Sequence, residues 1–194
     1  MTRALTIAVL LGHALGGCAT SSPPPPHLGR KVAVLPPNNR TGDPLAVAGT
    51  GLIDRYVRRA QIVTVADVLL SEARFQLEEK GFEVASRQAV DTALKEHIPT
   101  SPASAAQLAA QGGLGGLVLY LEIRRWEADA PIHTVFVIVG LGASLVDSST
   151  GQVIWRQERR AAPVPTPGEI RREAAYVTAA RKVIADMLAP LRPG

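Results

Sequence analysis

The sequence is poor in the residues that covalent cross-links, metal sites and catalytic centres require. It has 1 Cys and 4 His in 194 residues, and one cysteine can form neither an internal disulfide nor a zinc–thiolate cluster. No two of the histidines are spaced as metal ligands on a helix would be. The Gly-x-Ser-x-Gly motif of hydrolases is missing too. We therefore predict no catalytic residues, no metal, no cofactor and no enzymatic activity.

Lysine and aromatic residues are also scarce. Lys31, Lys80, Lys95 and Lys182 are the only lysines among the 21 basic residues, and the aromatic residues are 3 Phe, 3 Tyr and 2 Trp. The formal net charge is +4, but charges of both signs alternate along the chain, which argues against an arm that binds nucleic acid. Hydrophobic residues make up 46%, too many for a disordered chain and enough for one folded domain.

An apolar run lies close to the N-terminus. Residues 4–15 (ALTIAVLLGHAL) follow Arg3 and form a run of the size found in the hydrophobic region of a signal peptide. A helix that spans a bilayer needs about 20 apolar residues, so this run is too short to be a permanent span. We predict a signal peptide over residues 1–17.

The residues after this run resemble the bacterial lipobox, in which Leu and two small residues precede an invariant Cys. Here the four positions are Leu15, Gly16, Gly17 and Cys18. The resemblance implies cleavage between Gly17 and Cys18, a diacylglyceryl group on the Cys18 sulfur and a fatty acyl group on the new amine. Because Ala19 replaces the Asp that favours inner-membrane retention, it also implies export to the outer membrane.

Residues 18–29 contain a run of four prolines at 23–26. Such a run favours an extended polyproline II conformation with a rise of about 3.1 Å per residue. We predict a semi-rigid tether over residues 18–29, which carries a single folded domain over residues 30–194.

Apolar periodicity and turn residues predict the elements of that domain. We expect strands at 31–35, 82–85, 117–123, 134–146 and 151–160, and helices at 64–80, 86–96, 101–111 and 166–188. Residues 45–63 read as an irregular segment or a short extra hairpin. The order predicts an α/β fold: a mixed sheet with a parallel β-α-β start, an antiparallel C-terminal hairpin, and helices packed on the sheet.

Two polar or glycine-rich segments invite a functional interpretation but favour a structural one. Residues 112–116 (GGLGG) precede a strand and lack the Gly-Lys-Ser/Thr ending of a phosphate loop, so we interpret them as a helix-to-strand turn. Asp43 is the best polar candidate for a site, yet its Asn-Arg-Thr-Gly-Asp neighbourhood is typical of a turn. Thr166 and Glu169 form a capping-box pattern with Pro167, which predicts the start of the last helix.

Three segments together resemble one family of bacterial surface lipoproteins: residues 32–43 (VAVLPPNNRTGD), 77–82 (LEEKGF) and 144–155 (SLVDSSTGQVIW). This family is typified by the neisserial vaccine-candidate antigen and is related in fold to the N-terminal domain of TolB and, more distantly, to CsgG. The resemblance implies an α/β domain anchored to the outer membrane and facing the periplasm. It also implies self-association and a role in envelope assembly or transport, without established catalytic residues.

The predicted strand at 134–146 supplies candidates for an interface. Phe136 and Ile138 make its second face apolar, and if every helix lay on one side of the sheet they would form an exposed patch suited to self-association. Ile138→Glu should then give a monomer. Trp126, between Arg125 and Glu127, is expected to be partly exposed and to serve as an interface anchor.

The sequence therefore favours a non-enzymatic lipoprotein that contacts the membrane through its lipid, forms a homo-oligomer and binds no nucleic acid. Two alternatives stay open, a channel-associated secretion subunit and an envelope hydrolase.

Overall fold

A computed structural model describes residues 28–48 and 62–194. The strands are β1 (Lys31–Val34), β2 (Asn38–Asn39), β3 (Ala46–Ala48), β4 (Val63–Thr64), β5 (Glu83–Val84), β6 (Leu117–Ala128), β7 (Phe136–Asp147) and β8 (Val153–Pro165). The helices are α2 (Val65–Glu79), α3 (Arg87–Leu94), α4 (Pro102–Gln111) and α5 (Arg172–Leu188). The predicted signal peptide, its lipobox and Cys18 lie outside these residues.

The main sheet is mixed, as predicted. Its strand order is β5-β1-β6-β7-β8, and β2 pairs with a second stretch of β6. Strand β1 is parallel to both β5 and β6, whereas β6, β7 and β8 form an antiparallel meander. Residues 45–63, expected to form an irregular segment or a short extra hairpin, contribute β3 and the first residue of β4, and these two strands pair antiparallel in a small separate sheet.

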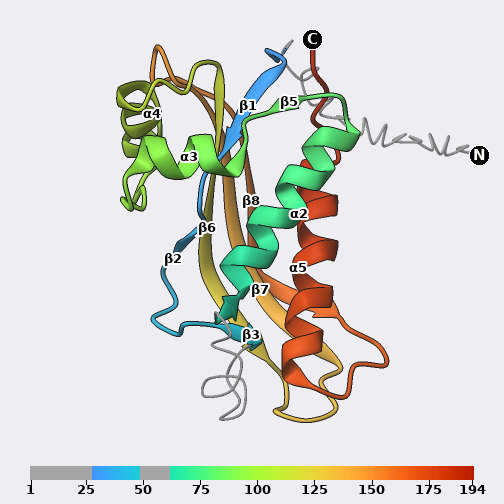
Figure 1. Ribbon diagram of the computed structural model, residues 1–194. Coiled ribbons are helices and arrows are strands. Elements are labelled where there is room, and N and C mark those ends of the chain that lie inside the picture. The colour runs from blue at the N-terminus through green and yellow to red at the C-terminus, as the bar shows by residue number, and fades with distance from the viewer. Residues whose placement is uncertain (1–27, 49–61) are drawn as a thin grey trace, which may run out of the picture.

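Helices cover both faces of the sheet (Figure 1). On one face α2 and α5 lie side by side and pack on the inward residues of β6 and β7, which form the larger core. On the other face α3 and α4 cover β1 and the beginning of β6, where Leu35 and Tyr120 belong to a second core. An exposed apolar patch at Phe136 and Ile138 was expected if all helices lay on one side of the sheet. The helices lie on both sides, so this condition is not met.

Helix starts follow the capping signals in the sequence. The Thr64 side chain accepts a hydrogen bond from the Asp67 N–H, and the Asp67 carboxylate accepts one from the Thr64 N–H, which completes a capping box at α2. Ser86 caps α3, and Ser101 caps α4 with Pro102 in its first turn. These side chains satisfy N–H groups that have no partner within the helix, so the predicted starts are confirmed.

The predicted start of the last helix is wrong. Helix α5 begins at Arg172, because residues 166–171 take part in a different structure. The Thr166 hydroxyl donates to the Thr134 carbonyl at 3.2 Å, and Gly168 has φ of +81°, outside the helical region. The His133 N–H also donates to the Ile170 carbonyl at 2.9 Å. The segment is thus held against the β6–β7 loop.

Strand β6 continues beyond its predicted end, with a bulge between Ile123 and Arg125. A bulge adds a residue and resets which side chains point inward. Trp126 is consequently only 3% exposed and packs edge-on against Tyr176 of α5. The expected partial exposure of Trp126 is wrong, and its ring belongs to the core instead of an interface.

Candidate interaction surfaces

The described residues hold little that resembles a reactive centre. Within residues 28–48 and 62–194, no group of three His, Cys, Asp or Glu side chains is arranged to hold a metal ion. No helix in these ranges is both long and apolar enough to cross a membrane. Asp43 serves its turn, since its carboxylate accepts a hydrogen bond from the Leu45 N–H at 2.8 Å.

The first surface is the part of the sheet that α3 and α4 leave uncovered, which we call the open face. At its centre Glu122 is only 8% exposed. The Arg124 Nε donates to Glu122 Oε1 at 2.8 Å, the Tyr120 hydroxyl donates to Oε2 at 3.2 Å, and Arg40 of the β1–β3 region approaches Oε1 at 3.3 Å. Asn38 of β2 donates in turn to the Tyr120 hydroxyl at 3.1 Å.

These contacts decide the charge state of Glu122. Burial raises the pKa of this carboxyl, but the hydrogen bond and charge of Arg124, the Tyr120 hydroxyl and Arg40 together outweigh it and lower the pKa. Burial and the neighbouring carboxylate raise the pKa of Tyr120, while the Asn38 hydrogen bond opposes them. Glu122 is therefore ionised at neutral pH and tied to its donors, which suits a structural ion pair better than an acid–base catalyst.

The network continues across the neighbouring strands. Arg124 reaches Glu158 of β8 at 3.4 Å. Its guanidinium group lies over Gly142 of β7, where a Cβ atom would come within 3.2 Å of Nη2. On β8, the Arg156 Nε donates to the Ser144 hydroxyl at 3.4 Å. The open face is thus dominated by charged side chains at its centre.

The two interface candidates of β7 lie farther along this face. Phe136 and Ile138 are half-buried, and their part in an interface stays a prediction. In the register of the sheet, Ile138 stands between Glu127 and Pro163, and Phe136 stands beside Pro165. These neighbours on both sides share the face with the apolar side chains.

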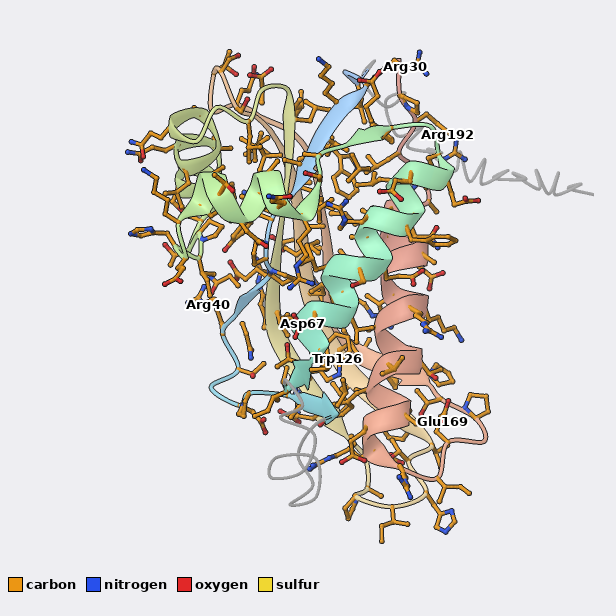
Figure 2. The ribbon with its side chains drawn as sticks, viewed as in Figure 1. Arg30, Arg40, Asp67, Trp126, Glu169 and Arg192 are labelled. Atoms are coloured by element: carbon orange, nitrogen blue, oxygen red, sulfur yellow. The ribbon has the colours of Figure 1, made fainter. Side chains whose placement is uncertain are left out.

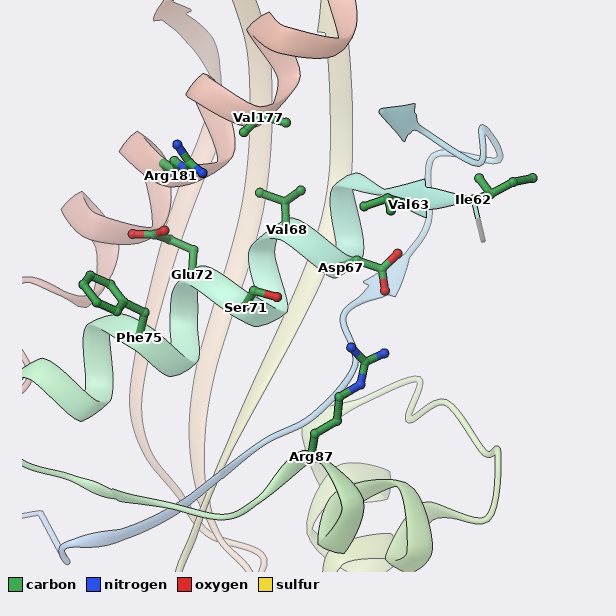
Figure 3. A pocket seen from close by; sticks show the side chains of 10 residues that line it. All are labelled: Ile62, Val63, Asp67, Val68, Ser71, Glu72, Phe75, Arg87, Val177 and Arg181. Atoms are coloured by element: carbon green, nitrogen blue, oxygen red, sulfur yellow. The ribbon is translucent and has the colours of Figure 1, made fainter. Parts of the chain in front are cut away.

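The second surface is a groove along the outer side of α2, with a volume of about 490 Å³. Figure 3 shows Val68 of α2 and Val177 of α5 facing each other across it, with Phe75 farther along α2. The Phe75 ring is 54% exposed. Charged side chains of both signs line the same groove, namely Asp67, Glu72, Arg87 and Arg181. We call this surface the groove.

The third surface lies at the end of the molecule opposite Arg30 and Arg192, and we call it the tip. It is formed by the β6–β7 loop and the β8–α5 loop. Its exposed aliphatic side chains are Ile132, Val135 and Ile170, at 63%, 63% and 62%. In Figure 2 the neighbouring Glu169 marks this end, and Arg30 and Arg192 mark the opposite one.

Comparisons with known proteins place the fold. No protein-family model and no curated protein sequence matches the chain. Among solved structures, the chain is similar to the PelC dodecamer from Paraburkholderia phytofirmans, with 20% identity, a TM-score of 0.51, and coverage of 87% of this chain and 93% of that one. A point variant of the same PelC protein gives a TM-score of 0.52 at 20% identity, over 86% and 90% of the two chains. At such identities the likeness shows a shared fold.

Lipoprotein GNA1162 from Neisseria meningitidis is also among the similar structures, as the sequence motifs predicted. It shares 16% identity, covers 84% of this chain and 100% of that one, and has a TM-score of 0.49. The expected α/β fold, with helices on a mixed sheet, is confirmed.

Most of these surface features were not predicted from the sequence. Glu122 carried a signal, because it is the one charged residue in the otherwise apolar run LVLYLEI at 117–123. A buried carboxylate needs partners, and one of these, Arg40, follows β2 and stands 82 residues earlier in the chain. The groove and the tip combine residues from separate helices and loops, which periodicity within one element does not reveal.

Proposed function

We propose that this chain is a lipid-anchored protein of the bacterial envelope that acts as a homo-oligomeric assembly or transport factor and catalyses no reaction. The observation that carries the proposal is the fold shared with PelC, which crystallised as a dodecamer. From this shared fold we infer that copies of this chain also associate with one another. In this proposal the lipobox-like residues Leu15, Gly16, Gly17 and Cys18 direct the attachment of the lipid, and Ala19 favours the outer membrane, with the domain facing the periplasm.

The attachment point of the tether supports this arrangement. Leu28 is buried, forms a bridge with Pro193, and accepts a hydrogen bond from the Gly194 N–H at 2.7 Å. Both ends of the domain are thus fastened together. If the part of the predicted tether that precedes Leu28 is extended at about 3.1 Å per residue, it spans roughly 30 Å. An anchored domain would then hold its tip on the side away from the anchor.

The surfaces support binding over catalysis. Glu122, the buried carboxylate, is ionised and accepts hydrogen bonds on both oxygens, so it has no free oxygen with which to move a proton. The groove combines exposed apolar and charged side chains, the mixture typical of interfaces between proteins. Assembly through such surfaces is the activity that we assign to the domain.

The anchor is tested by Cys18→Ser in cells fed an alkyne fatty acid. The native chain should take up the label and fractionate with membranes, whereas the variant should lose the label, because the thioether needs the thiolate of this cysteine. Thr20→Ser, two residues on, is the matched control and should behave as the native chain does. Label that persists in Cys18→Ser would contradict the lipoprotein assignment.

A further inference from the structure

We propose that copies of this chain assemble head to tail, with the tip of one copy seated in the groove of the next. The inference rests on the self-association proposed above and names the surfaces that bring it about. The tip supplies Ile132, Val135 and Ile170, and the groove receives them between Val68, Phe75 and Val177.

The tip is preorganised for such a contact. The Thr166 N–H donates to the Val135 carbonyl at 2.8 Å, and the Thr134 hydroxyl donates to the Ala130 carbonyl at 2.8 Å. Ile132 and Arg171 form an antiparallel bridge between the two loops. The aliphatic side chains therefore project from two loops that hydrogen bonds hold together, and little conformational entropy is lost when a partner covers them.

The groove has the room and the apolar side chains for such a contact. Its volume of about 490 Å³ lies in the range of pockets that hold drug-sized molecules, which is ample for a few branched aliphatic side chains. Val68 and Val177 form its floor and the half-exposed Phe75 closes one end (Figure 3). An aromatic ring in a groove of this kind is a frequent anchor of protein interfaces.

Charges around the two surfaces can also be matched. Arg171 and Arg172 follow Ile170 directly and are exposed at the tip, where Glu173 pairs with Arg172. The groove presents the carboxylates of Asp67 and Glu72 together with the guanidinium groups of Arg87 and Arg181, so the tip arginines fit the part of the groove that carries the two carboxylates. Opposite charges at the rim of an apolar contact fix its register and speed association. A second copy of this chain therefore fits the groove in both its apolar and its charged parts.

The geometry dictates the kind of assembly. Tip and groove are different patches, so each copy donates its tip to one neighbour and accepts a tip from another. Such heterologous contacts generate a closed ring when the repeated rotation closes and a filament when it does not. The tip lies at the loop end of the molecule (Figure 1), whereas the groove is lined by side chains of α2 and α5, so successive copies are rotated relative to one another.

Two substitutions test the proposal in the full chain, purified from membranes in detergent and weighed by native mass spectrometry. Ile132→Glu alters the tip and Phe75→Glu alters the groove, and each should weaken assembly at least about 100-fold by placing a carboxylate in an apolar contact. Both side chains are exposed in the single copy, so the circular dichroism spectrum should be unchanged. Ile98→Glu, at an equally exposed isoleucine (58%) of the α3–α4 loop, is the matched control and should assemble normally.

Mixing the two variants gives the decisive result. Ile132→Glu keeps an intact groove and Phe75→Glu keeps an intact tip, so an equimolar mixture, one partner ¹⁵N-labelled, should form a 1:1 heterodimer and nothing larger. Normal assembly of either single variant, or a mixture that stays monomeric, would overturn the proposal. The proposal would also be overturned if Ile138→Glu were the only one of the three variants to lose assembly, because the interface would then lie on β7.

Other outcomes separate this inference from its premise. A native chain that is monomeric at micromolar concentration would contradict the proposed self-association itself. The tip variant Ile132→Glu can also be tested in a Cys18→Ser background for binding to vesicles of phosphatidylethanolamine and phosphatidylglycerol. If this variant assembles normally but no longer binds the vesicles, the head-to-tail contact is overturned and the tip is a membrane-binding surface.

Discussion

Glu122 illustrates how a single residue links distant parts of this chain. Its carboxylate collects donors from β6 itself and from Arg40, 82 residues earlier. A buried carboxylate without donors would carry a large desolvation penalty. The contacts of Glu122 therefore hold the β2 segment in parallel register with β6, where Asn38 pairs with Glu122 itself.

Glu122→Gln tests this role through the pH dependence of stability. The pKa of Glu122 is lowered below its ordinary value of 4.5 in the folded state, so the ionised carboxylate stabilises the fold at pH values above 4.5. That contribution disappears as the pH falls through the lowered folded-state pKa. Urea unfolding at pH 7 should show a loss of about 1–3 kcal/mol in the variant, and the difference should shrink toward pH 3.

The matched control is Glu127→Gln, at an exposed ion pair with Arg125 on the same strand. Its urea midpoint should coincide with that of the native chain at pH 7, since water replaces the partner of an exposed carboxylate. An unchanged midpoint in Glu122→Gln at pH 7 would show that the network does not stabilise the fold.

The glycine-rich loop between α4 and β6 shows what an element needs at its boundary. Gly116 has φ of +90°, and a Cβ atom there would come within 2.8 Å of the Lys31 carbonyl oxygen in β1. The loop must pass this close because β6 pairs with β1 from Leu117 onward. This contact accounts for the glycine and supports the interpretation of residues 112–116 as a turn.

Gly116→Ala should destabilise the domain by about 2–4 kcal/mol, because it combines strain at positive φ with a backbone clash. Gly115→Ala is the control, since nothing lies within 4 Å of its added Cβ. Thermal unfolding followed by circular dichroism measures both. Equal melting temperatures for the two variants would contradict this account of the loop.

Element boundaries that depend on local chemistry could be predicted, and those that depend on tertiary contacts could not. The capping side chains of Thr64, Ser86 and Ser101 act within three residues, so they are visible in the sequence. Thr166 has the same local pattern, yet its hydroxyl bonds to Thr134 in a distant loop, which moves the start of α5. Trp126 was misplaced because a β-bulge, rather than simple alternation, sets its direction.

At the scale of the whole molecule, the start of the described domain and its last residues lie together, at the end opposite the tip. The buried Leu28 joins the N-terminal segment to the chain end at Pro193 and Gly194. The tip lies at the opposite end of the long strands β6 and β7 (Figure 1). A lipid-anchored copy in this orientation leaves both the tip and the groove available to neighbouring copies.

Native mass spectrometry of the full chain, extracted from bacterial membranes in detergent, tests the central claim most directly because it weighs the anchor and the assembly together. The account predicts that the protomer starts at Cys18, carries the mass of a diacylglyceryl and a fatty acyl group, and occurs as a complex of several identical copies. A protomer without lipid, or a lipidated protomer found only as a monomer at micromolar concentration, would contradict it.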